Sequence, residues 1–152
     1  MAAVLGVRCW SESFAYVVVS GSRTAPLLVA AAHVLLPVND NRGAQLASFR
    51  SDIYDVITSH CVSMVYFRRT EAIAKTKDQD RAQLEGVLQE LCYSHDPSVP
   101  VAGRTVAQLK SALKFAGKAN SVFELFDQPM FRNARLAKGK FQEAATTALS
   151  GL

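Results

Sequence analysis

The sequence predicts a single α/β domain, covering residues 1–152, that is built on a mixed sheet. Two regions with different hydrophobic patterns support this prediction. The first 38 residues contain three short runs of apolar, β-branched and aromatic side chains, which are typical of strands. From Gln45 onward, apolar residues recur at helical spacing and alternate with short apolar strands.

The three N-terminal runs predict an antiparallel meander. Turn signals such as Ser20-Gly21-Ser22 separate the runs, and adjacent strands with short connections usually pair with each other. The predicted strands cover residues 4–7, 14–19 and 27–36.

The rest of the chain predicts helices alternating with two more strands. The expected elements are a helix over 45–60, a strand over 62–67, a helix over 84–91, a strand over 99–102 and a closing helix over 141–149. Two further helices are expected behind capping boxes, in which Thr105 pairs with Gln108 and Ser121 pairs with Glu124.

Composition predicts a cytoplasmic protein without a membrane segment. The three cysteines follow no disulfide spacing, which indicates free thiols in a reducing compartment. No signal-peptide pattern is evident. The most apolar stretch, Leu27 to Val38, is much shorter than the ~20 residues that a membrane helix needs. The net charge of +4 permits a nucleic-acid partner without requiring one.

The predicted order of elements is β-β-β-α-β-α-β-α-α, and three segments carry a family resemblance. The opening segment VLGVRCWSESFAYVVV resembles the first hairpin of RuvC-type Holliday-junction resolvases, and the run FQEAATTALSGL resembles their last helix. The helix containing Leu84 to Val87 resembles their central helix. The chain is thus similar to the ribonuclease H-like superfamily over most of its length. The resemblance implies three antiparallel strands, then two parallel ones, with helices on both faces.

The same resemblance implies where a nuclease site would lie. Such nucleases hold two magnesium ions about 4 Å apart with clustered carboxylates. The first aspartate falls on Arg8, and the second acid falls on Arg68 or Arg69. In the last helix Glu143 matches one acid, whereas Thr146 takes the place of the other. Because three of four carboxylates are missing, the sequence argues against an enzyme, and no catalytic residue, metal or cofactor is expected.

Three functions remain open. The leading one is a catalytically inactive module that acts as a binding or assembly subunit, with an arginine–glutamate bridge in place of metal. The second is a nucleic-acid-binding protein with an arginine-lined groove, to which Lys75, Lys77 and Lys138 would add charge. The third is a metal-dependent nuclease whose ligands are relocated, with these candidates: Glu12, Glu71, Asp78 and Asp80.

The sequence leaves open which partner the protein binds and which role its strand aromatics have. The resemblance is compatible with a homodimer or a protein partner, with 84–91 and 122–126 as candidate contact faces, and with weak nucleic-acid binding. Trp10 and Phe14 flank the first turn, and Tyr66 and Phe67 lie on the fourth strand. Such aromatics either pack in the core, which is the commoner role, or stack on unpaired bases beside the arginines.

Overall fold

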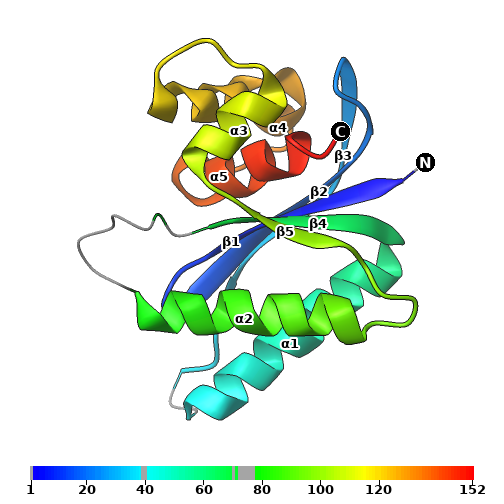
Figure 1. Ribbon diagram of the computed structural model, residues 1–152, viewed down its shortest axis with the longest axis vertical. Coiled ribbons are helices and arrows are strands. Elements are labelled where there is room, and N and C mark those ends of the chain that lie inside the picture. Colours follow the sequence, from blue (N-terminus) through cyan, green and yellow to red (C-terminus); the bar gives the residue numbers. More distant parts are fainter. Residues whose placement is uncertain (1, 39–40, 70, 72–77) are drawn as a thin grey trace.

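In the computed structural model, residues 2–38, 41–69, 71 and 78–152 are described, with only the backbone of residues 120 and 126. Five strands form one sheet in the order β3-β2-β1-β4-β5 (Figure 1). They are β1 (Ala3–Cys9), β2 (Ser13–Ser22), β3 (Ala25–Leu35), β4 (Val62–Arg68) and β5 (Val101–Arg104). The first three are antiparallel, and β4 and β5 continue the sheet parallel to β1. The predicted mixed sheet is confirmed.

Helices cover both faces of this sheet (Figure 1). One face carries α1 (Arg42–Ser59) and α2 (Gln79–Ser94). The other carries α3 (Val106–Leu113), the 3-10 helix η1 (Ala119–Asp127), α4 (Pro129–Asn133) and α5 (Lys138–Leu149).

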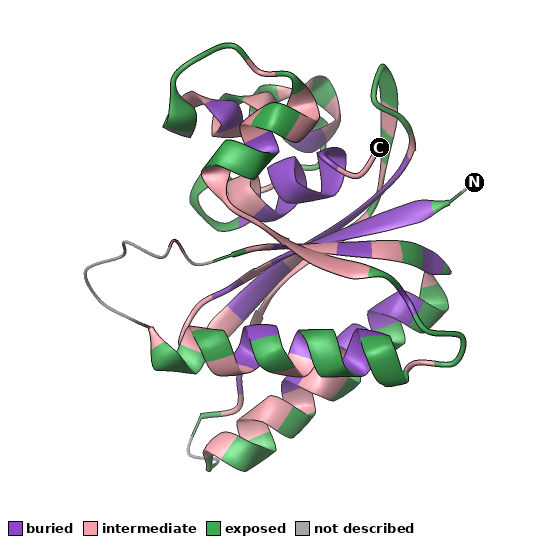
Figure 2. Cartoon of the chain, viewed as in Figure 1, coloured by how far each residue is buried: buried purple, intermediate pink, exposed green. Residues whose placement is uncertain are grey.

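Each face of the sheet has its own hydrophobic core. Along β1, Leu5 and Val7 join the core beneath α1 and α2, whereas Val4 joins the core beneath α5. Because successive side chains of a strand point to opposite faces, Arg8 lies on the α5 face with Val4. The buried residues of both cores run through the middle of the molecule (Figure 2).

Side-chain caps fix the start of several helices. Asn41 accepts a hydrogen bond from the backbone N–H of Ala44, and Asp78 accepts one from Arg81. The capping box of Thr105 with Gln108 is confirmed. The second box, at Ser121, was predicted wrongly. A 3-10 helix already starts at Ala119, so Ser121 lies inside it and its N–H donates to the carbonyl of Lys118.

Gly6 lets α5 pack directly on β1. A Cβ atom at Gly6 would lie 2.1 Å from the carbonyl oxygen of Ala144 and 2.5 Å from the backbone nitrogen of Ala148. These are backbone atoms, so only glycine permits this approach. The close contact sets the position of Glu143, which neighbours Ala144 on α5.

Both segments that were predicted as candidate contact faces contribute to the core. Leu84, Leu88 and Leu91 are buried on α2, and Val122 is buried on η1. These side chains are therefore unavailable to a partner, and the homodimer or protein partner stays a prediction. Within the described ranges, no helix combines the length and apolarity needed to cross a bilayer.

The three cysteines are free and differ in exposure. Cys9 and Cys92 are buried, whereas Cys61 is exposed. Burial raises the pKa of Cys9 to about 12 and that of Cys92 to about 11, which suppresses the reactive thiolate. We expect a maleimide at mildly alkaline pH to modify one thiol per folded chain, and Cys61→Ser to abolish that reaction. Mass spectrometry checks this, and rapid modification of two or three thiols would contradict it.

Candidate functional site

The parallel pairing of β1 with β4 brings two arginines together at the strand ends. The register pairs Val7 with Phe67, the residues just before Arg8 and Arg68. Val7 and Phe67 both pack in the core beneath α1 and α2. Because side chains alternate along a strand, both arginines face α5 instead. This confirms the predicted adjacency of the two strands and of the residues at their ends.

Glu143 of α5 lies between these two guanidinium groups. Its Oε2 is 3.0 Å from Nε of Arg8 and 3.1 Å from Nε of Arg68. The side chains are 13%, 11% and 24% exposed for Arg8, Arg68 and Glu143. We call these three residues the arginine triad. It carries two positive charges against one negative charge in a largely dry setting.

The triad is held by charge more than by aligned hydrogen bonds. Among the described residues, the buried Nε groups of Arg8 and Arg68 have no well-aligned hydrogen-bond acceptor. Burial lowers the pKa of Arg8, Glu143 opposes that shift, and Arg81 and Arg68 add to it. Arginine nevertheless stays protonated at physiological pH. Both guanidinium groups of the triad therefore stay charged, and their Nε atoms are buried against Glu143.

Further hydrogen bonds and ion pairs surround the end of β4 and connect it to α2 and α3. Nη1 of Arg68 lies 3.3 Å from Oε1 of Glu71, which also accepts the backbone N–H of Val106 at 2.9 Å. Arg81 pairs with Glu85 at 2.7 Å and donates through Nη2 to the carbonyl oxygen of Arg68 at 2.5 Å. Arg81 of α2 thus holds the backbone of Arg68, and Glu71 links the Arg68 side chain to the start of α3.

Two of the five predicted site residues lie outside the triad. Arg69 is exposed, and in the described part of the chain its side chain forms no ion pair. Thr146 is fully buried, and its hydroxyl has no hydrogen-bond partner among the described residues. Lys138 pairs with Asp127 at 3.4 Å. Lys75 and Lys77 lie outside the described residues.

The residues present do not fit a two-magnesium site. Arg8 and Arg68 stand where the resemblance places acids, and Glu143 is held by both of them. The acidic residues that were considered as relocated metal ligands form other interactions or do not lie together. Glu71 pairs with Arg68, and Asp78 caps α2 and accepts a hydrogen bond from Ser11. Across the described ranges, no three His, Cys, Asp or Glu side chains converge on one ion position.

Two aromatic residues beside the triad differ from those in the core. Phe14 and Phe67 are buried, as expected for core packing. Trp10 is only partly buried, and the guanidinium of Arg8 lies 4.8 Å from its ring centroid. Arg104 lies 4.5 Å from the ring centroid of Tyr66 in the same way. Arg104 was missed in the sequence because the predicted fifth strand ended two residues too early.

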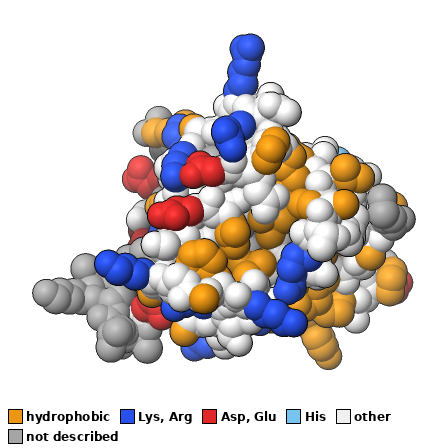
Figure 3. Space-filling model, turned by 90° about the horizontal axis from the view of Figure 1, so that it is seen from above, with side chains coloured by type: hydrophobic (Ala, Val, Ile, Leu, Met, Phe, Trp, Pro, Cys, Tyr) orange, Lys and Arg blue, Asp and Glu red, His pale blue; other side chains and the backbone are white. Residues whose placement is uncertain are grey.

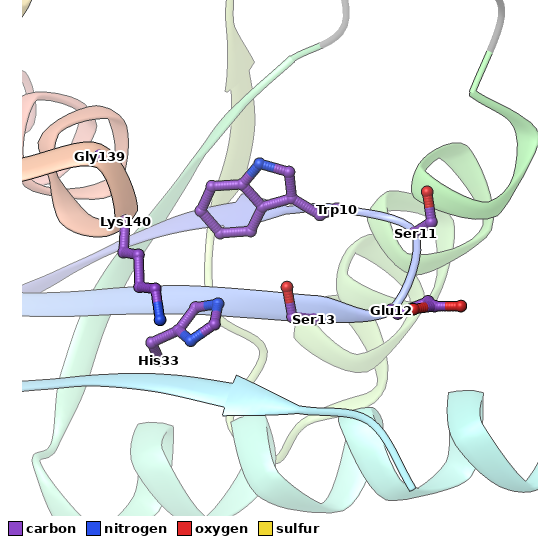
Figure 4. A pocket seen from close by; sticks show the side chains of 7 residues that line it. All are labelled: Trp10, Ser11, Glu12, Ser13, His33, Gly139 and Lys140. Atoms are coloured by element: carbon purple, nitrogen blue, oxygen red, sulfur yellow. The ribbon is translucent and has the colours of Figure 1, made fainter. Parts of the chain in front are cut away.

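An open groove adjoins Trp10. Its volume is about 520 Å³, and it is lined by residues of the β1–β2 turn, β2, β3 and α5 (Figure 4). On the face over α3, α4 and α5, basic side chains are scattered around a band of hydrophobic ones, and acidic side chains lie to one side of that band (Figure 3). The triad and this groove are therefore the features from which a function can be argued.

The solved structures that resemble this chain include several Holliday junction resolvases. No family model and no curated protein matches the sequence. Thermus thermophilus RuvC superposes with a TM-score of 0.79 at 14% identity, over 97% of this chain and 92% of that one. T. thermophilus RuvC in complex with a Holliday junction substrate gives 0.75 at 13% identity, over 99% and 92%. The yeast mitochondrial Holliday junction resolvase Ydc2 gives 0.65 at 12% identity, over 98% and 77%.

The chain has a RuvC-type, ribonuclease H-like fold. Within this fold, the triad occupies the ends of the two central parallel strands, β1 and β4. The RuvC-type arrangement of strands and helices is therefore kept, while the charge at its centre is reversed from the acids that the resemblance implies.

Proposed function

We propose that the chain is a RuvC-type module without nuclease activity that acts as a binding subunit, with nucleic acid as its ligand. The observation that carries this proposal is the arginine triad, in which Arg8 and Arg68 share one carboxylate at the ends of β1 and β4. A site built this way attracts anions and repels divalent cations.

The charges around Glu143 disfavour cleavage. A two-metal mechanism needs several carboxylates around the ions to balance their charge and fix their geometry. Here Glu143 is neutralised by two guanidinium groups about 3 Å away. A magnesium ion at this carboxylate would meet both positive charges at close range, and no other carboxylate in the triad offsets them.

Nucleic acid is the proposed ligand because arginines gather at the ends of β1 and β4. Guanidinium groups form paired hydrogen bonds with phosphate oxygens, and most protein contacts that position a nucleic acid go to the backbone. Arg8 and Arg68 are paired with Glu143 and Glu71, whereas the adjoining Arg69 is exposed and forms no ion pair among the described residues. The superposed T. thermophilus RuvC is in complex with a Holliday junction substrate. A branched DNA is therefore the first ligand to test.

Cleavage and binding assays on branched, duplex and single-stranded substrates test this proposal. We expect no hydrolysis with magnesium or manganese, and weak binding that falls steeply with salt. Arg68→Ala and Arg69→Ala should each reduce the slope of log affinity against log salt by about 0.7–0.9, one phosphate contact. Arg68→Ala leaves Arg8 paired with Glu143, so thermal melting should detect a folded protein.

The matched control is Arg50→Ala on α1. Arg50 pairs with Glu90 on the helical face opposite α5 and should not alter the salt slope. Hydrolysis that survives repurification and disappears in Glu143→Ala would instead establish a nuclease with relocated ligands. Absence of binding at low salt would leave a role in protein assembly as the better account.

A further inference from the structure

We infer that the groove beside Trp10 binds one unpaired nucleotide, with its base stacked on the indole and its phosphate held by Lys140. This inference rests on the proposed nucleic-acid binding and specifies which part of the ligand is bound here. It makes single-stranded or splayed segments, rather than continuous duplex, the preferred ligand.

The shape of the groove suits a nucleotide. Its volume of about 520 Å³ falls within the ~300–1,000 Å³ typical of small-ligand sites. Trp10 comes from the end of β1, His33 from β3 and Lys140 from α5. Figure 4 shows these three side chains gathered around the same opening. A flat ring, a polar ring and a cation thus converge from three separate elements.

Trp10 is held as a platform. The guanidinium of Arg8 lies 4.8 Å from its ring centroid, and the imidazole of His33 contacts it edge-on, with the ring centroids 5.7 Å apart. Such contacts fix the ring before a ligand arrives, which reduces the entropy lost on binding. A base that stacks on an aromatic ring needs no particular sequence, because every base has a π-face.

The polar groups of the groove match the rest of a nucleotide. Lys140 is exposed and supplies the positive charge for a phosphate. Burial, and then the ammonium group of Lys140, lower the pKa of His33, so its imidazole is neutral at neutral pH. A neutral imidazole can donate through one nitrogen and accept through the other, as base edges require. Glu12 also lines the groove, but it is exposed and its charge is screened by solvent.

Arg8 links this groove to the triad. The same guanidinium stacks on Trp10 and pairs with Glu143. A nucleotide stacked on the indole would therefore lie next to the triad. Bases inside a duplex are already stacked on their neighbours, so only an unpaired nucleotide can enter.

Fluorescence provides a direct test, because Trp10 is the only tryptophan in the chain. The probes are short oligothymidylate, oligouridylate and a blunt DNA duplex of equal length, with anisotropy of a labelled strand as the independent measure of binding. We expect the single strands to quench Trp10 and to bind more tightly than the duplex. Trp10→Ala should weaken single-strand affinity roughly 5- to 150-fold, the loss of one stacked base.

Two further variants separate stacking from folding. Trp10→Phe keeps an aromatic face and should retain most of the affinity, and Lys140→Gln should reduce the salt slope by about 0.7 for single strands. Tyr93→Ala removes an aromatic side chain that is 84% exposed on α2 and should change nothing. Equal affinity for single strand and duplex with unquenched Trp10 would overturn this inference while leaving the proposed function intact. Absence of binding to every probe and also to branched DNA would overturn both.

Discussion

Gly6→Ala is expected to lower the free energy of unfolding by about 3 kcal/mol, the upper end of the usual cost of overpacking. The new methyl group would lie 2.1 Å from the carbonyl oxygen of Ala144 and 2.5 Å from the nitrogen of Ala148. Both are backbone atoms of α5, so relief requires the whole helix to move away from β1. Denaturant unfolding of the variant and the wild type measures the difference.

The matched control is Gly86→Ala on α2. A Cβ atom there would meet no heavy atom within 4 Å, and alanine favours the helix over glycine. This variant should gain about 0.5–1 kcal/mol. A Gly6→Ala variant as stable as the wild type would mean that α5 does not rest against β1 as described.

Glu143→Gln is expected to cost about 2–3 kcal/mol of unfolding free energy. The substitution keeps the size of the side chain but leaves Arg8 without its carboxylate partner and Arg68 with Glu71 alone. Breaking a fully buried ion pair costs ~3–5 kcal/mol, and the loss is smaller here because 24% of the Glu143 side chain is exposed. Chemical unfolding at neutral pH measures it.

The control for this charge effect is Glu90→Gln. Glu90 pairs with Arg50 at 2.9 Å, but the two side chains are 57% and 43% exposed, so the loss should stay below about 1 kcal/mol. Replacing the whole triad with Arg8→Met, Arg68→Met and Glu143→Leu should recover most of the stability, because the one charge that then loses its partner, Glu71, is 37% exposed to water. Equal stabilities of Glu143→Gln and Glu90→Gln would refute a structural role for the triad.

The sequence by itself determined the order of the five strands and of the helices between them, and the family resemblance it carries predicted the reversal of charge at the site, whereas the short helix α4 was not predicted. Apolar runs with β-branched residues mark strands, and helical spacing marks the segments between them, because each pattern reflects which face is buried. Arg8, Arg68 and Glu143 could be named in advance because they fall at strand ends and on a helix that the family resemblance places together. Their pairing then follows from opposite charge.

Only the tertiary structure decided which of two adjacent residues belongs to the site. Arg68 joins the triad and Arg69 does not, because adjacent side chains at the end of a strand point in different directions. A shift of the strand by one residue would bring Arg69 to the triad in place of Arg68. The same alternation buries Phe14 and Phe67 and leaves Trp10 beside the groove. The distance from Glu143 to the sheet depends on the close packing of α5 against Gly6, which has no side chain. Gly6 and α5 are far apart in the sequence, so this contact exists only in the folded chain. Local patterns determine what each segment is, whereas packing between segments determines which atoms meet.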